Sequence, residues 1–264
     1  MMDILGFKAL INRISIKNIV QRMEYVFRKI PNVDSVCCEF SRDAKYTRNL
    51  TLKCGAANFS DTLLLWSQPI NPNDHRESFP FEKHFFRTVS NIIFHAFLAD
   101  IPLRVGVSFG EVYIDTENNI FLGQAIIDAH LIEIAQDWVG GALHPNCPVI
   151  LLLEQGYSSE FIASYEVPIK TDNNIKLKYA IDWTSEAQLS RPISIREFGV
   201  FYRERMEQQY SKLLTDAPET AKAKYINAKE FTDLMIIQGR KRLAEGLFMN
   251  IGYGPKHRKY IRHK

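Results

Sequence analysis

Three helix-like segments alternate with short strand-like runs over the first 152 residues of the chain. Apolar residues recur at roughly helical spacing over residues 8–30, 81–100 and 124–139. Between them lie VDSVCCEF at 33–40, LTLKCGAANFSDTLLLW at 50–66 and IPLRVGVSFGEVYI at 101–114, which are typical of strands and hairpins. This alternation, with hairpins that are antiparallel, predicts an α+β domain in which helices pack against a mixed, largely antiparallel sheet.

Local signals predict where several of these elements end. Pro31 follows the first helical segment, and Gly140 and Gly141 follow the third, so both helices should stop there. The run at 50–66 holds Ser60 and Asp61 between two apolar halves, which predicts a hairpin with its turn at 58–61. The apolar run CPVILLLEQ at 147–155 predicts a buried strand.

The pattern changes after about residue 152. We expect one domain over residues 1–152 and an additional β-hairpin region over 153–190, with a polar turn at 171–174. Residues 191–250 contain two long amphipathic stretches, 194–214 and 218–246, which predict C-terminal helices. Residues 251–264 form a basic tail.

Charge and composition exclude some classes of protein. The net charge of +3 comes from the tail, since removing its five basic residues from the 33 Lys and Arg leaves 28 against 30 acidic residues. The body therefore lacks the basic surface expected of a nucleic-acid-binding protein. No apolar run is long enough to cross a membrane, and no signal peptide is readable. Four cysteines without CxxC spacing favour reduced thiols in a cytoplasmic protein: Cys37, Cys38, Cys54 and Cys147.

Two aspartates stand in apolar sequence, Asp3 in MDILGF and Asp61 in NFSDTLL. A buried carboxylate needs a partner, which can be a backbone amide, an arginine or a metal ion. Asp3 alone is equally well explained as a helix cap, and Asp61 alone as an ordinary turn residue.

The order of four motifs resembles that of class III nucleotidyl cyclases. These motifs are DILGF before a helix, an SD hairpin, LRVGVSFGEV, and FLGQAIIDAHLIE, and together they span roughly residues 2–152. The resemblance implies a cyclase-like fold and a reaction in which the ribose 3′-hydroxyl of a nucleoside triphosphate attacks its own α-phosphorus and expels pyrophosphate. It also implies a homodimer with two shared active sites.

The resemblance assigns roles to residues of the first and second motifs. Asp3 and Asp61 match the family's metal-binding aspartates, and the carbonyl of Ile4 would complete one coordination shell. Two divalent ions are expected, Mn²⁺ first and Mg²⁺ as the alternative. The segment of Gly6, Phe7 and Lys8 would cradle the triphosphate at the start of a helix, with Phe7 as a bracing residue.

The chain departs from the family at the residues that read a purine base and hold the ribose. The two base-reading positions are Ala57 and Ile120, and both are apolar. The helix asparagine and arginine of the family are replaced by Ile127 and Leu131. Three positions are candidates for the missing base or phosphate contacts: Tyr46, Arg48 and Ala57. Tyr46 and Arg48 are explained equally well as surface residues at the edge of a loop.

These departures make the chain similar to the pyrimidine cyclases of bacterial Pycsar antiphage systems. The resemblance implies conversion of UTP or CTP, with UTP expected first, to a cyclic monophosphate that activates a separate effector protein. Two alternatives stay open: an ATP or GTP cyclase with a rearranged base pocket, and a catalytically silent module that binds a nucleotide or a partner. Arg104 is expected to form a structural salt bridge. Because Asp3 is almost terminal, we expect either that the family's first strand is missing or that the start codon is assigned too far downstream, and a truncated sheet edge would hold Asp3 loosely.

Overall fold

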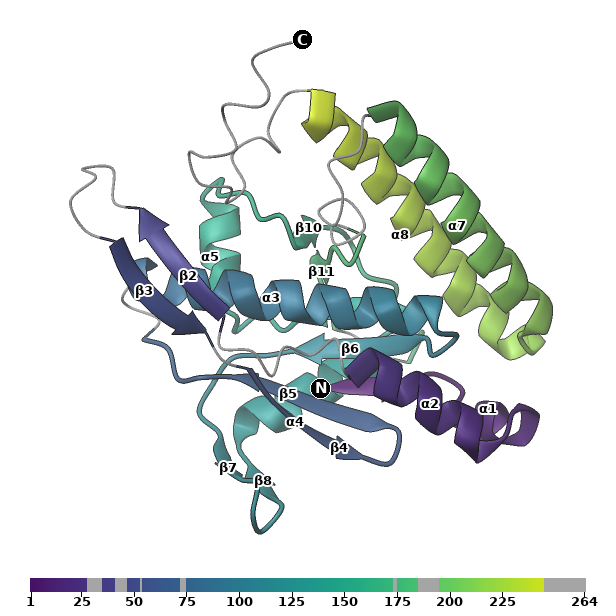
Figure 1. Ribbon diagram of the computed structural model, residues 1–264, viewed down its shortest axis with the longest axis horizontal. Coiled ribbons are helices and arrows are strands. Elements are labelled where there is room, and N and C mark those ends of the chain that lie inside the picture. The colour runs from purple at the N-terminus through teal and green to yellow at the C-terminus, as the bar shows by residue number, and fades with distance from the viewer. Residues whose placement is uncertain are drawn as a thin grey trace.

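A seven-stranded sheet forms the centre of the computed structural model, which describes residues 1–27, 35–40, 47–52, 54–71, 75–172, 175–184 and 195–244 (Figure 1). Its strand order is β10-β11-β9-β6-β1-β5-β4, and the one parallel pair among these neighbours is β6 with β9. The prediction of a mixed, largely antiparallel sheet is confirmed. The strands are β1 (Met2–Ile4), β4 (Cys54–Phe59), β5 (Thr62–Ser67), β6 (Leu103–Val107), β9 (Gly140–Leu143), β10 (Ile162–Ser164) and β11 (Tyr179–Ile181).

Two hairpins lie outside this sheet. Strand β2 (Ser35–Phe40) pairs with β3 (Thr47–Leu52), and β7 (Tyr113–Asp115) pairs with β8 (Ile120–Leu122). Within the main sheet, the hairpin of β4 and β5 turns at Ser60 and Asp61, inside the predicted turn, since Phe59 pairs with Thr62. Ser60 adopts the left-handed conformation, with φ of 56°, that such a tight turn requires.

Helices cover both faces of the sheet. Helix α3 (His75–Leu98) lies on one face, because a Cβ on Gly141 would meet Ile93 of α3 at 3.2 Å. Helix α2 (Ile16–Phe27) packs beside α3 (Figure 1). Helix α4 (Gln124–Ala135) lies on the opposite face, directly against Gly106 of β6. The core between these layers is formed by buried aliphatic and aromatic side chains, among them Val105, Phe97 and Ile132.

The close approach of α4 to β6 depends on Gly106. A Cβ at this position would lie 1.9 Å from the carbonyl oxygen of Ala129 and 2.7 Å from the backbone nitrogen of Glu133. Both are backbone atoms, so the helix itself has to move. We expect Gly106→Ala to lower the free energy of unfolding by about 1–3 kcal/mol, measured by urea denaturation. Gly156→Ala has the opposite defect, because its φ of 89° strains an alanine although a Cβ there meets nothing within 4 Å, so it measures backbone strain without crowding. A Gly106→Ala variant as stable as wild type would contradict the crowding argument.

A C-terminal helical hairpin, α7 (Ile195–Asp216) and α8 (Glu219–Ala244), packs at the end of α3, as Figure 1 shows. The Phe231 ring lies against Trp138 and Tyr165, with centroids 5.0 and 4.8 Å away. The ring of Tyr210 of α7 packs against that of Phe97 of α3, with ring centroids 4.8 Å apart. The two predicted C-terminal helices are therefore confirmed, and they share the core of the preceding residues.

Three element predictions are wrong in detail. The helix expected at 8–30 is two helices, α1 (Phe7–Arg13) and α2, because Ile14 is extended and the hydroxyl of Ser15 accepts a hydrogen bond from the Asn18 N–H, a cap for α2. Helix α4 ends at Ala135, and Gly140 and Gly141 begin β9 instead. The run at 147–155 is not a strand but helix α5 (Val149–Glu154), preceded by a helical Pro148. A short apolar run fits either element, so periodicity could not decide.

The expectation of a truncated sheet edge at Asp3 is also wrong. Strand β1 is central, with β5 on one side and β6 on the other. Met1 extends the pairing, since its backbone exchanges hydrogen bonds of 2.8 and 2.9 Å with Gly106. Asp3 is therefore held between two neighbouring strands, although β1 has only three residues.

Candidate functional site

Asp3 and Asp61 are brought together by the pairing of β1 with β5. Asp3 lies opposite Thr62 in the register of the two strands, next to the turn that contains Asp61. The Ile4 N–H donates a 3.1 Å hydrogen bond to the carbonyl of Asp61. Two motifs separated by more than fifty residues thus meet at one end of the central strand. The Asp3 side chain is 26% exposed, so it is open to solvent on one side.

Asp3 belongs to a partly buried charge network on the face of the sheet that α4 covers. Arg104, opposite Asp3 on β6, places Nη2 3.7 Å from the Asp3 carboxylate and donates from Nε to Glu133 at 2.5 Å. Glu133 of α4 is buried, and its other oxygen lies 3.4 Å from Nδ1 of His130. Arg104 also donates to the carbonyl of Gln136. The salt bridge expected at Arg104 is present, and it connects Asp3 to α4.

The charges around Asp3 are unbalanced. Burial first, and then the negative charges of Glu133 and Asp61, raise the pKa of Asp3 to about 6, against the opposing effects of Arg104 and His130. The carboxylate of Asp3 is thus less stable in its charged form than an exposed one. A cation placed between Asp3 and Asp61 would relieve this repulsion.

The segment predicted to cradle phosphate begins α1. Gly6 precedes the helix with φ of 71°, a left-handed conformation that favours glycine, and a Cβ there would meet nothing within 4 Å. Phe7 packs against the core and Lys8 is exposed. The first N–H groups of a helix have no partner within it, so this segment offers donors beside Asp3 and Asp61. The packing of Phe7 agrees with its expected bracing role.

Ala57 and Ile120, the two positions at which the resemblance expects base contacts, lie on hairpins that contact each other. Phe121, next to Ile120 on β8, contacts Phe59 and Trp66 at ring-centroid distances of 5.0 and 5.9 Å. Phe59 and Trp66 stand on the same face of the β4–β5 hairpin as Ala57, on either side of it. The β7–β8 hairpin therefore covers the surface that contains Ala57 with aromatic rather than polar side chains.

The remaining sequence candidates lie apart from Asp3 or beyond the described residues. Ile127 and Leu131 of α4 are 53% and 46% exposed and face away from the sheet. Tyr46 lies outside the described residues. Arg48 is in β3, where its backbone pairs with Glu39, and its side chain lies outside what the structure describes.

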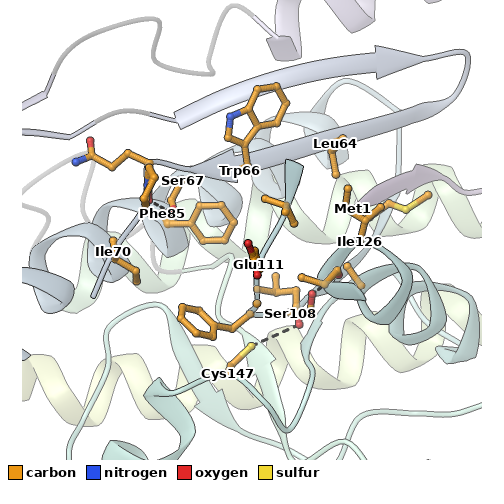
Figure 2. A pocket seen from close by; sticks show the side chains of 18 of the residues that line it. Met1, Leu64, Trp66, Ser67, Ile70, Phe85, Ser108, Glu111, Ile126 and Cys147 are labelled. Atoms are coloured by element: carbon orange, nitrogen blue, oxygen red, sulfur yellow. Dashed lines mark hydrogen bonds between the residues drawn. The ribbon is translucent and has the colours of Figure 1, made fainter. Parts of the chain in front are cut away.

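A cavity of about 470 Å³ opens on the same face of the sheet as Asp3 (Figure 2). Strand β5, the segment that follows β6 and the first half of α4 form its walls. Figure 2 shows Trp66 and Phe85 on one side of the cavity, Ser108 and Cys147 on the other, and Glu111 directed between them. No sequence pattern indicates this cavity, because its walls come from segments that are distant in the chain.

Sequence reasoning also missed Glu133. Its signal was present in LIEIA, where one acidic residue stands in an apolar stretch of helix, the same feature that identified Asp3 and Asp61. A buried carboxylate in such a stretch needs a partner, and Arg104 supplies it.

The donors near Asp3 fit a hard divalent cation. Carboxylate and backbone carbonyl oxygens suit Mg²⁺ and Mn²⁺, and Asp3, Asp61 and Ile4 supply them. Among the described residues, no group of three or more His, Cys, Asp or Glu side chains is placed to hold a metal ion. A Mg²⁺ ion is commonly bound by one or two carboxylates, with water and substrate phosphate oxygens as its other ligands.

Comparisons with protein-family models, curated proteins and solved structures found no match to the chain. Within the described part of the chain, none of the helices is long and apolar enough to cross a membrane.

Proposed function

We propose that the chain is a metal-dependent nucleotidyl cyclase that converts UTP, in preference to CTP, to the 3′,5′-cyclic monophosphate and pyrophosphate. The observation that carries the proposal is the meeting of Asp3 and Asp61 beside the exposed start of α1. The sheet supports it: β1, the β4–β5 hairpin and β6 lie in the order β6-β1-β5-β4, a split β-α-β arrangement consistent with a cyclase-like fold.

The chain's own residues have separate tasks in this reaction. Asp3, Asp61 and the Ile4 carbonyl would hold two divalent ions, Mn²⁺ or Mg²⁺, which when bound help to deprotonate the 3′-hydroxyl and to neutralise the pyrophosphate. The N–H groups at Gly6 and Phe7 and the ammonium of Lys8 bind and orient the triphosphate. The 3′-oxygen forms a bond to the α-phosphorus as the bond to the β-phosphate oxygen breaks, and the hydroxyl proton passes to solvent.

The preference for a pyrimidine rests on the loss of purine-reading groups. Ala57 and Ile120 offer no hydrogen bond to a base, and Phe121 packs over this surface against Phe59 and Trp66. A site without those polar groups gains nothing from a purine edge. The product would act on a separate effector that senses cyclic nucleotides, as the resemblance to antiphage cyclases suggests.

An exposed apolar surface supports the homodimer. Ile127 and Leu131 of α4 and Leu122 of β8, which is 61% exposed, lie at helix and hairpin positions that face solvent in the single chain. Exposed apolar side chains that gather in this way mark interaction surfaces. In a homodimer with shared active sites, this surface of one chain would face the aspartates of the other.

The same surface is also what favours a second candidate, a catalytically silent cyclase-like module. Ile127 and Leu131 replace the residues that hold ribose and phosphate in the family, and a module that binds a partner would keep an apolar surface in their place. The other alternative, an ATP or GTP cyclase, differs from the proposal in its substrate.

One assay separates these readings. The purified protein is incubated with Mn²⁺ and each of UTP, CTP, ATP and GTP, and the products are identified by mass spectrometry. We expect cyclic UMP as the main product, with less cyclic CMP. A cyclic purine product would favour the altered base pocket, and no cyclic product from any triphosphate would refute the cyclase proposal.

A further inference from the structure

The cavity on the face of the sheet that α4 covers has the walls of a site for a flat ring. Trp66, Phe85 and Phe109 supply aromatic side chains, and Leu64, Val107 and Ile126 supply aliphatic ones. Its volume of about 470 Å³ is within the range of small-molecule sites in proteins. Such walls favour a planar heterocycle that stacks on an indole.

These walls are held in place by segments that pack closely onto two glycines, Gly55 and Gly123. A Cβ on Gly55 would lie 2.3 Å from the Trp66 indole, so the indole rests directly on β4. A Cβ on Gly123 would lie 2.5 Å from the carbonyl oxygen of Glu111, so the segment with Glu111 is pressed against the start of α4. Ligand binding would therefore require little rearrangement of Trp66 or of the Glu111 backbone.

Glu111 gives the cavity its polarity. Its side chain is directed between Trp66 and Ser108 (Figure 2) and has no hydrogen bond or ion pair with any residue that the structure describes. The Ser108 hydroxyl already donates its hydrogen bond to the carbonyl of Ala125, so it has no proton left to donate to a ligand. An ionised carboxylate only accepts hydrogen bonds, so it would select a ring that carries N–H groups.

The cavity and Asp3 share one face of the sheet. Met1 lines the cavity, and Asp3 is two residues further along the same extended chain. Leu64 also lines it, and Thr62, two residues earlier on β5, pairs with Asp3. Alternate residues of a strand point to the same face, with a rise of about 7 Å for two residues. The cavity therefore continues the surface on which the Asp3 carboxylate lies.

We propose that this cavity binds the pyrimidine base of the nucleotide, with the ring stacked on Trp66 and an N–H of its edge donated to Glu111. The inference rests on the proposed function for the identity of the ligand, and it assigns the base to the same chain whose Asp3 lies beside the phosphates. Uracil N3–H and the cytosine amino group both offer the donor that Glu111 requires.

The test uses nucleosides, which lack phosphates and so require no metal ion at Asp3. Uridine, cytidine and adenosine are titrated separately into ¹⁵N-labelled full-length protein, and the indole N–H signals of the three tryptophans are followed by NMR. Trp66→Phe identifies the Trp66 signal. Trp138 and Trp183 are fully buried and do not line the cavity, so they act as internal references.

We expect saturable shifts of the Trp66 signal with uridine and cytidine. Glu111→Ala should weaken this binding about 10-fold or more, the effect of one hydrogen bond to a charged acceptor. The matched control is Glu117→Ala, which removes an exposed carboxylate of the β7–β8 turn that does not line the cavity. The dispersion of the remaining NMR signals shows whether each variant is folded.

The outcomes separate this inference from the proposed function. If no nucleoside shifts Trp66, or if Glu111→Ala binds as tightly as the Glu117→Ala control, the base site is overturned even when a cyclic product forms. If pyrimidine nucleosides bind through Glu111 but no triphosphate is cyclised, the base site is supported and the cyclase activity is refuted.

Discussion

Replacing Glu133 with alanine is expected to lower the free energy of unfolding by about 3–5 kcal/mol, because it leaves the guanidinium of Arg104 buried without its closest partner. Glu133 and Arg104 are both buried, and their ion pair of 2.5 Å connects α4 to β6. Glu133→Gln retains an oxygen that can accept a hydrogen bond from Arg104, so it should lower the free energy of unfolding by less than Glu133→Ala does. Urea denaturation of the metal-free protein measures both variants.

An exposed ion pair provides the control for this prediction. Lys229 and Asp233 of α8 form an ion pair of 2.7 Å, in which the Lys229 side chain is 36% exposed and that of Asp233 52%. Asp233→Ala should therefore change stability by about 0.5 kcal/mol or less. If Glu133→Ala costs no more than Asp233→Ala, then Glu133 does not have the structural role that its burial indicates.

Asp3→Asn is expected to abolish cyclisation while making the metal-free protein more stable. The pKa of Asp3 is raised to about 6, by burial first and then by Glu133 and Asp61, so the folded chain favours the neutral side chain that asparagine imitates. The gain at pH 7.5 should be about 1–3 kcal/mol, toward the lower end because the side chain is partly exposed. Loss of a metal ligand should reduce turnover about 100-fold or more.

The pH dependence of this stabilisation has a defined sign. Between pH 4 and 6 the folded wild-type chain binds more protons at Asp3 than the unfolded chain, so its stability falls as the pH rises through this window. The advantage of Asp3→Asn should thus be absent below about pH 4 and complete above about pH 7. Thermal unfolding of both proteins from pH 4 to 8 measures it. An asparagine variant less stable than wild type at pH 7.5 would refute the charge imbalance.

Local sequence patterns predicted the individual helices, strands and turns better than they predicted which strands pair. The turn at Ser60 and Asp61 was predictable because polar turn residues interrupt two apolar halves, and the C-terminal helices because their patterns are long. The helix within the run at 147–155 was not predictable, since an apolar segment of that length fits a strand or a helix equally. The parallel pairing of β6 with β9 joins segments that α4 separates, and no local signal specifies it.

Some residues of the candidate site could also be identified from local sequence, whereas others depend on the tertiary fold. Asp3 and Asp61 could be identified from the sequence because carboxylates in apolar stretches need a partner. Their neighbours Arg104 and Glu133 depend on how α4 crosses β6, which requires the glycine at 106 and the tertiary fold. The position of Glu111 in the cavity depends on packing between Gly123 and the segment after β6, which the sequence does not reveal.

Binding of Mn²⁺ in the presence of a substrate analogue tests the central claim that Asp3 and Asp61 hold metal ions for nucleotide chemistry. Free Mn²⁺ is measured by electron paramagnetic resonance while wild type, Asp61→Asn and Asp216→Asn are titrated with 3′-deoxy-UTP present, which binds but has no 3′-hydroxyl to react. Asp216 is the control, an exposed carboxylate paired with Arg13. We predict two bound ions per chain in wild type and control, and binding weakened about 100-fold in Asp61→Asn. Equal Mn²⁺ binding by all three proteins would contradict the account.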